Sequence, residues 1–71
     1  MTINSFYRVE ILAGNDINGE PFWTTAWLNH REMIGLSSHN AIQCAKELRA
    51  LRANTRIVHV LEEVVNEDEM I

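Results

Sequence analysis

One stretch of the sequence, residues 37–65, limits the possible folds of this chain more than any other. Ser37 and Ser38 can accept hydrogen bonds from the free N–H groups of a first helical turn. Apolar residues then recur at three- and four-residue spacing, with no Gly or Pro among them, as in an amphipathic helix. This stripe consists of Ala41, Cys44, Ala45, Leu48 and Leu51, with Ile42 beside it. We expect the helix to stop near Asn54, because Asn tolerates the left-handed conformation.

The segment after this helix predicts a strand. Residues 56–61 (RIVHVL) are rich in β-branched side chains, and both faces of the strand would be largely apolar. Such a strand typically lies in the middle of a sheet or at a subunit contact, and the second position would support a homodimer. Val64 and Val65 continue the apolar pattern, and residues 66–71 (NEDEMI) predict an acidic, frayed tail.

Two further strands are predicted before the helix. Residues 6–13 (FYRVEILA) alternate as a strand does, and we expect their odd-numbered side chains to face the core. Residues 14–21 are dense in turn formers and long for a tight hairpin, so we expect a mobile tip. Residues 22–28 (FWTTAWL) predict the second strand. Its face toward the helix would carry Phe22, Thr24, Ala26 and Leu28, and its other face Trp23, Thr25 and Trp27.

The segment between the second strand and the helix leaves the number of strands open. Residues 29–32 (NHRE) predict a polar turn, and residues 33–36 (MIGL) are short and apolar and could add a strand. The predicted fold class is α+β, with a small antiparallel sheet of three or four strands packed on one helix. The expected order is β-β-(β)-α-β. We expect a single domain over residues 1–65, followed by the acidic tail.

The size and charge of the chain limit its class. At 71 residues a lone core rarely supplies more than about 3–5 kcal/mol, and the single cysteine excludes an internal disulfide. Self-association or a partner would therefore supplement the core. The lone thiol, with no signal peptide or long apolar run, favours a cytoplasmic protein without a membrane segment. A net charge of −4 argues against an electrostatic clamp for nucleic acid.

The residue types that carry chemistry do not form a recognisable site in the sequence. His30, His39 and His59 are far apart and have no metal-ligand spacing. Cys44 lies on the apolar stripe, so we expect it to be a small buried apolar residue and not a nucleophile. We therefore expect no catalytic residues, no metal and no cofactor, and predict that the chain is not an enzyme.

The aromatic residues of the second strand indicate a protein-binding role. If the helix covers the opposite face, Trp23 and Trp27 face solvent and form the kind of patch that marks a binding surface. The alternative is that one tryptophan belongs to the core and the face assignment is inverted. Carboxylates near the end of the chain could contact a basic site on the partner. These candidate residues are Glu62, Glu63, Glu67, Asp68 and Glu69.

A second hypothesis is a small nucleic-acid-binding protein. Lys46, Arg49 and Arg52 are three residues apart and would form a stripe on the exposed side of the helix, with Arg56 following. Such a stripe could contact phosphates while a tryptophan stacks on single-stranded bases. A solvated helix face is the simpler interpretation of these residues.

The layout as a whole resembles that of many small phage-encoded accessory proteins. The resemblance rests on a turn-rich hairpin, the helix AIQCAKELRALRANT, the strand RIVHVLEE, an acidic end and a length near seventy residues. It implies a protein that binds a host protein and inhibits or modulates it. It covers most of the chain, contains no family-specific motif and assigns no functional residue.

Overall fold

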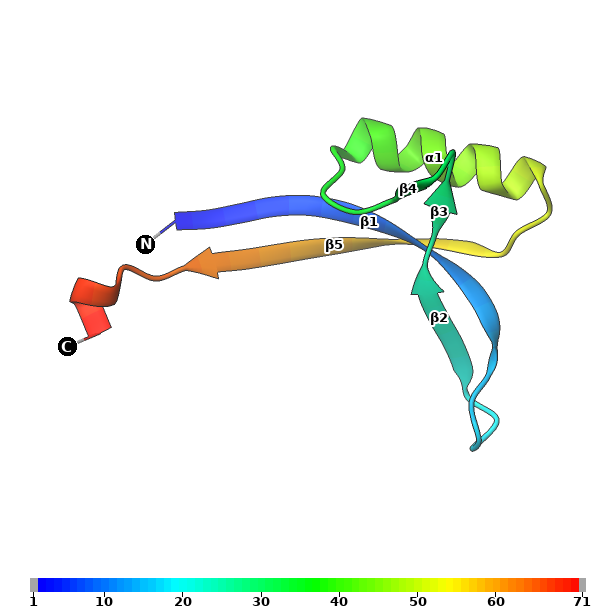
Figure 1. Ribbon diagram of the computed structural model, residues 1–71, viewed down its shortest axis with the longest axis horizontal. Helices are drawn as coiled ribbons and strands as arrows, with labels where there is room; N and C mark the ends of the chain where they lie inside the picture. The colour runs from blue at the N-terminus through cyan, green and yellow to red at the C-terminus, as the bar shows by residue number, and fades with distance from the viewer. Residues whose placement is uncertain (1, 71) are drawn as a thin grey trace.

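A long N-terminal strand is the centre of the structure. The computed structural model describes residues 2–70, with only the backbone described for Glu69 and Met70. Strand β1 (Thr2–Asn15) pairs antiparallel with β2 (Pro21–Thr25) and with β5 (Thr55–Val64), which gives the order β2-β1-β5 (Figure 1). A two-stranded sheet joins β3 (Trp27–Leu28) to β4 (Arg31–Glu32), and helix α1 (Ser38–Ala50) packs against β1 and β5. The predicted α+β fold class is confirmed.

The strand that follows the helix lies at the edge of the sheet, so the expectation of a central position is wrong. β1 takes the centre because its fourteen residues are long enough for two partners. Residues 2–11 of β1 pair with β5, and residues 10–15 pair with β2. The alternative expectation, that this strand lies at a subunit contact, stays a prediction.

The core is small and consists mostly of small side chains. Its buried members are Val9, Ala26, Ala41, Cys44, Ala45 and Leu48. Four of the five residues of the predicted helix stripe are therefore buried, and these small residues let the helix lie close to the sheet. The fifth, Leu51, is 72% exposed, so its assignment to the core is wrong. The helix has already ended at Ala50, which turns Leu51 away from the stripe.

The helix ends earlier than expected, through its backbone. The N–H of Ala53 donates to the carbonyl of Leu48, and the N–H of Arg52 donates to that of Arg49. These two bonds form a Schellman motif, which satisfies carbonyls that the last turn leaves free. The left-handed residue of the motif is Arg52, with φ of 66°, and not Asn54. Ala53 packs against the core, as the residue after the left-handed position commonly does.

Replacing Arg52 with glycine is expected to stabilise the protein. A Cβ in the left-handed region costs roughly 1–2 kcal/mol, and the extra backbone entropy of glycine in the unfolded chain offsets part of that gain. We expect Arg52→Gly to raise the free energy of unfolding by about 1 kcal/mol, measured by urea denaturation. Arg52→Ala is the matched control, because it removes the guanidinium and keeps the Cβ. An equal gain in both variants would show that the side chain, and not the backbone conformation, is responsible.

The loop between β1 and β2 is shorter than the sequence indicates. β1 continues to Asn15 past a bulge at Leu12–Gly14, so only residues 16–20 remain as the loop. Asp16 holds this loop closed: its Oδ1 accepts hydrogen bonds from the N–H groups of Asn18 and Glu20. Its backbone N–H and carbonyl bond to Glu20 and Gly19. The expectation of a long connection is wrong, and the mobility of its tip stays a prediction.

The predicted second strand is broken at Ala26. The N–H of Ala26 donates to the carbonyl of Val9, and its own carbonyl accepts from Met33. After this contact the chain leaves the main sheet and forms the β3–β4 hairpin. Residues 33–36 return along the edge of β1, where Leu36 exchanges two hydrogen bonds with Tyr7. They supply β1 with bonding partners without forming a regular strand.

The N-terminal half of β1 and the part of β5 after His59 form an arm that extends beyond the helix. Their pairing runs without interruption from Ile11–Thr55 to Thr2–Val64 (Figure 1). Ile3 is 65% exposed and Leu61 is 67% exposed on this arm. The molecule measures 49 × 33 × 18 Å, and its radius of gyration is 15.3 Å. A compact domain of this length would have a radius of gyration of about 11 Å, so the arm makes the chain markedly elongated.

Candidate protein-binding surface

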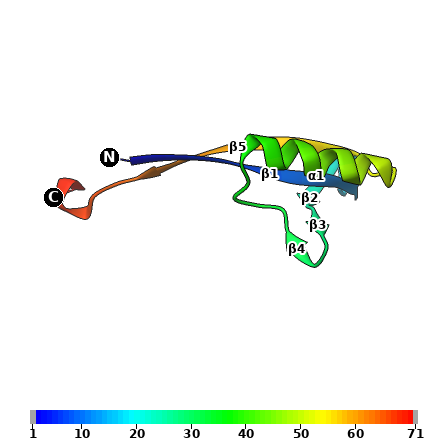
Figure 2. The same ribbon diagram turned by 90° about the horizontal axis from the view of Figure 1, so that it is seen from above.

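The β3–β4 hairpin stands away from the rest of the molecule. Figure 2 shows it projecting from the layer that contains α1, β1 and β5. Its two-residue turn requires positive φ at both positions, and Asn29 and His30 have φ of 53° and 65°. The prediction of a polar turn is therefore confirmed for these two residues, whereas Arg31 and Glu32 form β4. The turn fixes the direction in which the hairpin presents its side chains.

Trp27 lies on this hairpin, opposite Glu32, and is 63% exposed. The prediction that this tryptophan faces solvent is confirmed. Of the four residues expected to face the helix, Ala26 is buried and Leu28 packs against the core, but Phe22 and Thr24 are exposed. The error has a physical cause: the break at Ala26 interrupts the alternation, so residues before it and after it do not share a face.

A groove of about 270 Å³ lies between the hairpin and the first half of the helix. Leu28, Met33, Ile34 and Leu36 give it an apolar lining, and Cys44 lies at its helix side. Ile34 is 48% exposed at this groove. Charged and polar groups complete its lining, namely Arg31, Glu32, Asn40, Gln43 and Glu47. The groove was not predicted from the sequence, where the apolar run at residues 33–36 was its only signal.

Trp23 has a different environment from Trp27. It is half-buried on β2, and the guanidinium carbon of Arg56 lies 4.6 Å from the centre of its ring. At this distance the cation and the π face attract each other. Arg56 also donates a hydrogen bond to Oε1 of Glu10 at 2.7 Å. The expectation of one shared patch made by both tryptophans is therefore not met, because Trp23 packs on an ion-pair cluster of the main sheet.

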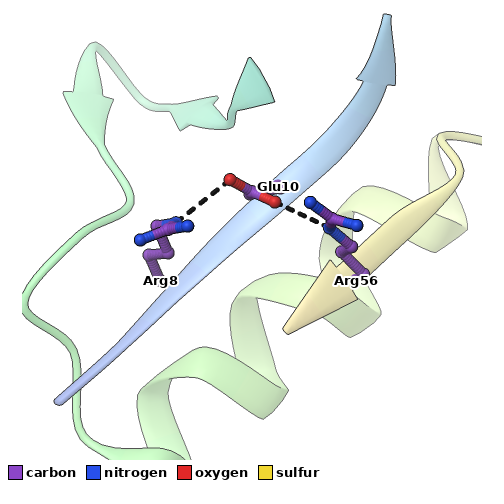
Figure 3. Close-up of polar contacts among 3 residues, drawn as sticks. All are labelled: Arg8, Glu10 and Arg56. Carbon is purple, nitrogen blue, oxygen red and sulfur yellow. Dashed lines mark hydrogen bonds and ion pairs between the residues drawn. The ribbon is translucent and has the colours of Figure 1, made fainter. Parts of the chain in front are cut away.

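Glu10 is the centre of that cluster. Its carboxylate lies between two guanidinium groups, with Arg8 Nε at 3.0 Å on one oxygen and Arg56 Nε at 2.7 Å on the other (Figure 3). The side chain of Glu10 is 9% exposed, whereas those of Arg8 and Arg56 are 36% and 48% exposed. This role of Glu10 could not be predicted from the sequence, because Arg56 is 46 residues away from Glu10 along the chain.

The two arginines keep Glu10 ionised. Burial by itself would raise the pKa of this carboxyl, since a charge is costly away from water. The hydrogen bonds from Arg56 and Arg8, together with their positive charges, outweigh this effect and lower the pKa below its usual value near 4.5. The cluster is thus a structural ion-pair network, built across β1 and β5 on the sheet face opposite the helix.

The candidate acidic residues fall into two groups. Glu62 and Glu63 belong to β5 and lie opposite Asn4 and Ile3 of β1, on opposite faces of the arm, so they are not part of a tail. Glu67 and Asp68 are exposed in the short 3-10 helix η1 (Glu67–Met70). The side chain of Glu69 lies outside the described part of the structure. Fraying of this end stays a prediction, although Asn66 Oδ1 accepts a hydrogen bond from the N–H of Asp68.

The four basic candidates do not form one stripe. Lys46 and Arg49 lie on exposed positions of α1, and the Nε of Arg49 donates to Thr55 Oγ1. Arg52 follows the helix in the left-handed conformation, so it does not continue the spacing. Arg56 is held on the main sheet by Glu10 and Trp23. The structure therefore gives the nucleic-acid hypothesis less support than the sequence does.

Cys44 and His59, the other candidates for chemistry, both pack within the fold. Cys44 is 4% exposed, and burial raises the pKa of its thiol, with the charge of Glu47 acting in the same direction. His59 stacks on Tyr7, with ring centres 4.5 Å apart, and shares a hydrogen bond with Ser5. Among the side chains of residues 2–68, no group of three His, Cys, Asp or Glu is placed to hold a metal ion. No helix in the same part of the chain is long and apolar enough to cross a bilayer.

Comparison with known family models, characterised proteins and solved structures gave no match for this chain.

Proposed function

We propose that this chain is a non-enzymatic protein-binding module that contacts its partner through the β3–β4 hairpin. The exposure of Trp27 carries this proposal, because this tryptophan is 63% exposed on a projecting hairpin and so leaves most of its side chain accessible to a partner. Tryptophan is among the side chains most enriched at the energetic centre of protein interfaces.

The groove beside the hairpin supports the same surface. An apolar side chain of a partner can enter between Met33, Ile34 and Leu36 while the rim is bounded by polar groups. This combination of an apolar centre and a polar rim is the usual anatomy of a protein interface. Glu32 links the two features, because it lies opposite Trp27 on the hairpin and also lines the groove.

The acidic end gives the proposed partner a preferred charge. No basic residue follows Arg56 in the sequence, whereas Glu67 and Asp68 are exposed. A partner with a basic patch would be steered toward this end of the chain, mainly through its association rate. If that partner is a host enzyme or regulator, binding would inhibit it, as the resemblance to phage-encoded accessory proteins implies.

Trp27→Ala is expected to weaken partner binding at least about tenfold, because it removes the proposed anchor without changing the core. The immobilised chain would be used to capture proteins from host lysate, and the dissociation constant of the purified captured protein would then be measured. Trp23→Ala is unsuitable as a test, since Trp23 supports the Arg56–Glu10 pair.

Phe22→Ala is the matched control, because Phe22 is an aromatic residue of similar exposure, 55%, on the other hairpin. The proposal expects this variant to bind as the wild type does. Equal losses in the two variants, or unchanged binding by Trp27→Ala, would place the contact elsewhere. Binding of a single-stranded oligonucleotide at low salt, with the steep salt dependence of phosphate contacts, would favour the nucleic-acid hypothesis instead.

A further inference from the structure

Among residues 2–70, no backbone segment pairs with the outer edge of β5. β5 is the last strand in the order β2-β1-β5, and its ten residues have no strand on their other side. Tyr7 and Val9 direct their N–H groups toward residues 33–36, so the alternate residues of β1 direct theirs toward β5. It follows that Ile57, His59 and Leu61 point their backbone N–H and carbonyl groups outward. A long edge of this kind is a template for pairing with another strand.

The chain also exposes more surface than a monomer of its size requires. Its accessible surface is 5643 Å², whereas a folded protein of 8.2 kDa is expected to expose about 4,500 Å². The excess is about 1,100 Å², and a standard protein interface removes about 800 Å² from each partner. Four exposed large apolar residues lie on or next to the arm, namely Ile3, Leu61, Val64 and Val65.

The sequence of β5 is complementary to itself when reversed about His59. An antiparallel pair related by a two-fold axis through His59 places Ile57 opposite Leu61 and Val58 opposite Val60. Arg56 then lies opposite Glu62, and each of these pairs occurs twice. Apolar residues meet apolar residues, and the two charged residues have opposite signs.

Neighbouring registers lack this match. The two-fold axis must pass through a residue, because an axis between two residues would pair residues that face opposite sides of the sheet. The nearest alternative centres are therefore Val60 and Val58. A centre at Val60 would place Val58 opposite Glu62 and Ile57 opposite Glu63. A centre at Val58 would place Arg56 opposite Val60. The centre at His59 is the register of these three that leaves no charge opposite an aliphatic side chain.

We propose that β5 pairs with β5 of a second copy of this chain, antiparallel and centred on His59. The product is a two-fold symmetric dimer with one continuous six-stranded sheet, in the order β2-β1-β5-β5-β1-β2. In each β5, the residues after His59 lie beside the residues before His59 in the β5 of the second copy. The exposed arm of one copy is therefore next to the helix of the other. This surface is separate from the β3–β4 hairpin, so the proposal does not rest on the proposed function.

Light scattering of the wild-type chain over a dilution series is the first test. The expected mass is about 16 kDa, twice that of the 8.2 kDa chain. A mass of one chain at all concentrations up to the millimolar range would overturn the proposal. Retention of partner binding by such a monomer would leave the proposed function intact, so the two failures are distinguishable.

Cysteine cross-linking in a Cys44→Ala background tests the register. In the proposed dimer the Cα atoms of the two His59 residues are about 5.5 Å apart, within the range of a disulfide, so His59→Cys is expected to form a covalent dimer under mild oxidation. Ile57→Cys and Leu61→Cys are the matched variants. Each is about 13 Å from its own copy and should cross-link only when the two variants are mixed. Efficient self-linkage of Leu61→Cys would overturn the register.

Charge reversal tests the pairing of Arg56 with Glu62. Glu62→Arg places like charges opposite each other at two symmetry-related points and is expected to raise the dissociation constant of the dimer about tenfold. Glu63→Arg is the matched control, because Glu63 lies opposite the neutral Thr55 in this register. Equal effects of the two reversals would contradict it.

Discussion

Replacing Leu48 with alanine is expected to lower the free energy of unfolding by about 3 kcal/mol, within the range of roughly 2–5 kcal/mol for buried leucines. Leu48 is 7% exposed and is the largest apolar side chain that the helix contributes to the core. The other buried members of the core are small, namely three alanines, Cys44 and Val9, and they have few atoms that can move into the cavity. Since a core of this size supplies only about 3–5 kcal/mol, the variant should be largely unfolded at low protein concentration.

Leu51→Ala is the control for this experiment, because the sequence places both leucines on the same stripe. Leu51 is 72% exposed, and its truncation is expected to change the stability by less than about 0.5 kcal/mol. Urea denaturation followed by circular dichroism at fixed protein concentration compares the two variants, and fixing the concentration removes the contribution of association. Similar losses in both would mean that the helix continues past Ala50 and buries Leu51 as well.

Replacing Glu10 with glutamine is expected to lower the free energy of unfolding at pH 7 by about 2 kcal/mol. The substitution keeps the shape of the side chain but removes the charge that holds Arg8 and Arg56, and hydrogen bonds to charged groups contribute roughly 1.5–3 kcal/mol each. Both arginines remain partly exposed, so water compensates for part of the loss. This keeps the expected effect below that of breaking a fully buried ion pair.

The pH dependence distinguishes this charge effect from a packing effect. The pKa of Glu10 is lower in the folded than in the unfolded chain, so the unfolded state binds a proton first as the pH falls. The stabilisation by Glu10 is therefore complete above the unfolded pKa near 4.5 and is lost as the pH falls through the lower folded pKa. We expect the difference between wild type and Glu10→Gln to shrink as the pH is lowered from 7 to 3, measured by urea denaturation.

Glu20→Gln serves as the control in that series, because Glu20 is exposed in the β1–β2 loop and its side chain has no ion pair with the described side chains of residues 2–68. Its stability should follow that of the wild type at every pH. A difference between wild type and Glu10→Gln that stays constant down to pH 3 would mean that the ionised carboxylate is not the source of the stabilisation.

Features that depend on neighbours in sequence could be predicted, as the helix shows. Its start at Ser37 and its buried stripe from Ala41 to Leu48 follow from spacing and from the capping side chain, whose Oγ accepts from the N–H of Asn40. Its end could not be predicted, because a Schellman motif with arginine in the left-handed position has no sequence signal of the kind that glycine gives.

Features that depend on distant segments were the ones the sequence could not place. The strand order depends on the length of β1, which continues four residues before and two residues after the predicted range 6–13. The faces of residues 22–28 depend on Ala26, where a bond to Val9 breaks the alternation. The Glu10 cluster needs residues from both ends of the chain. The exposure of Trp27 was predicted from the alternation of residues 22–28, which holds within the short stretch from Ala26 to Leu28, whereas the groove beside it could not be predicted.

The pairing of β1 with β5 also determines when this chain can fold. The residues of the two strands that lie opposite each other are separated by 44 to 62 positions, from Ile11–Thr55 to Thr2–Val64. Contacts between such distant positions form slowly, because closing a long loop is costly before any contact compensates for it. During synthesis, β1 leaves the ribosome long before its partner strand exists. The edge of β1 that faces β5 therefore stays unpaired until nearly the whole sequence has been made, and this interval is when it is most open to aggregation and to proteases.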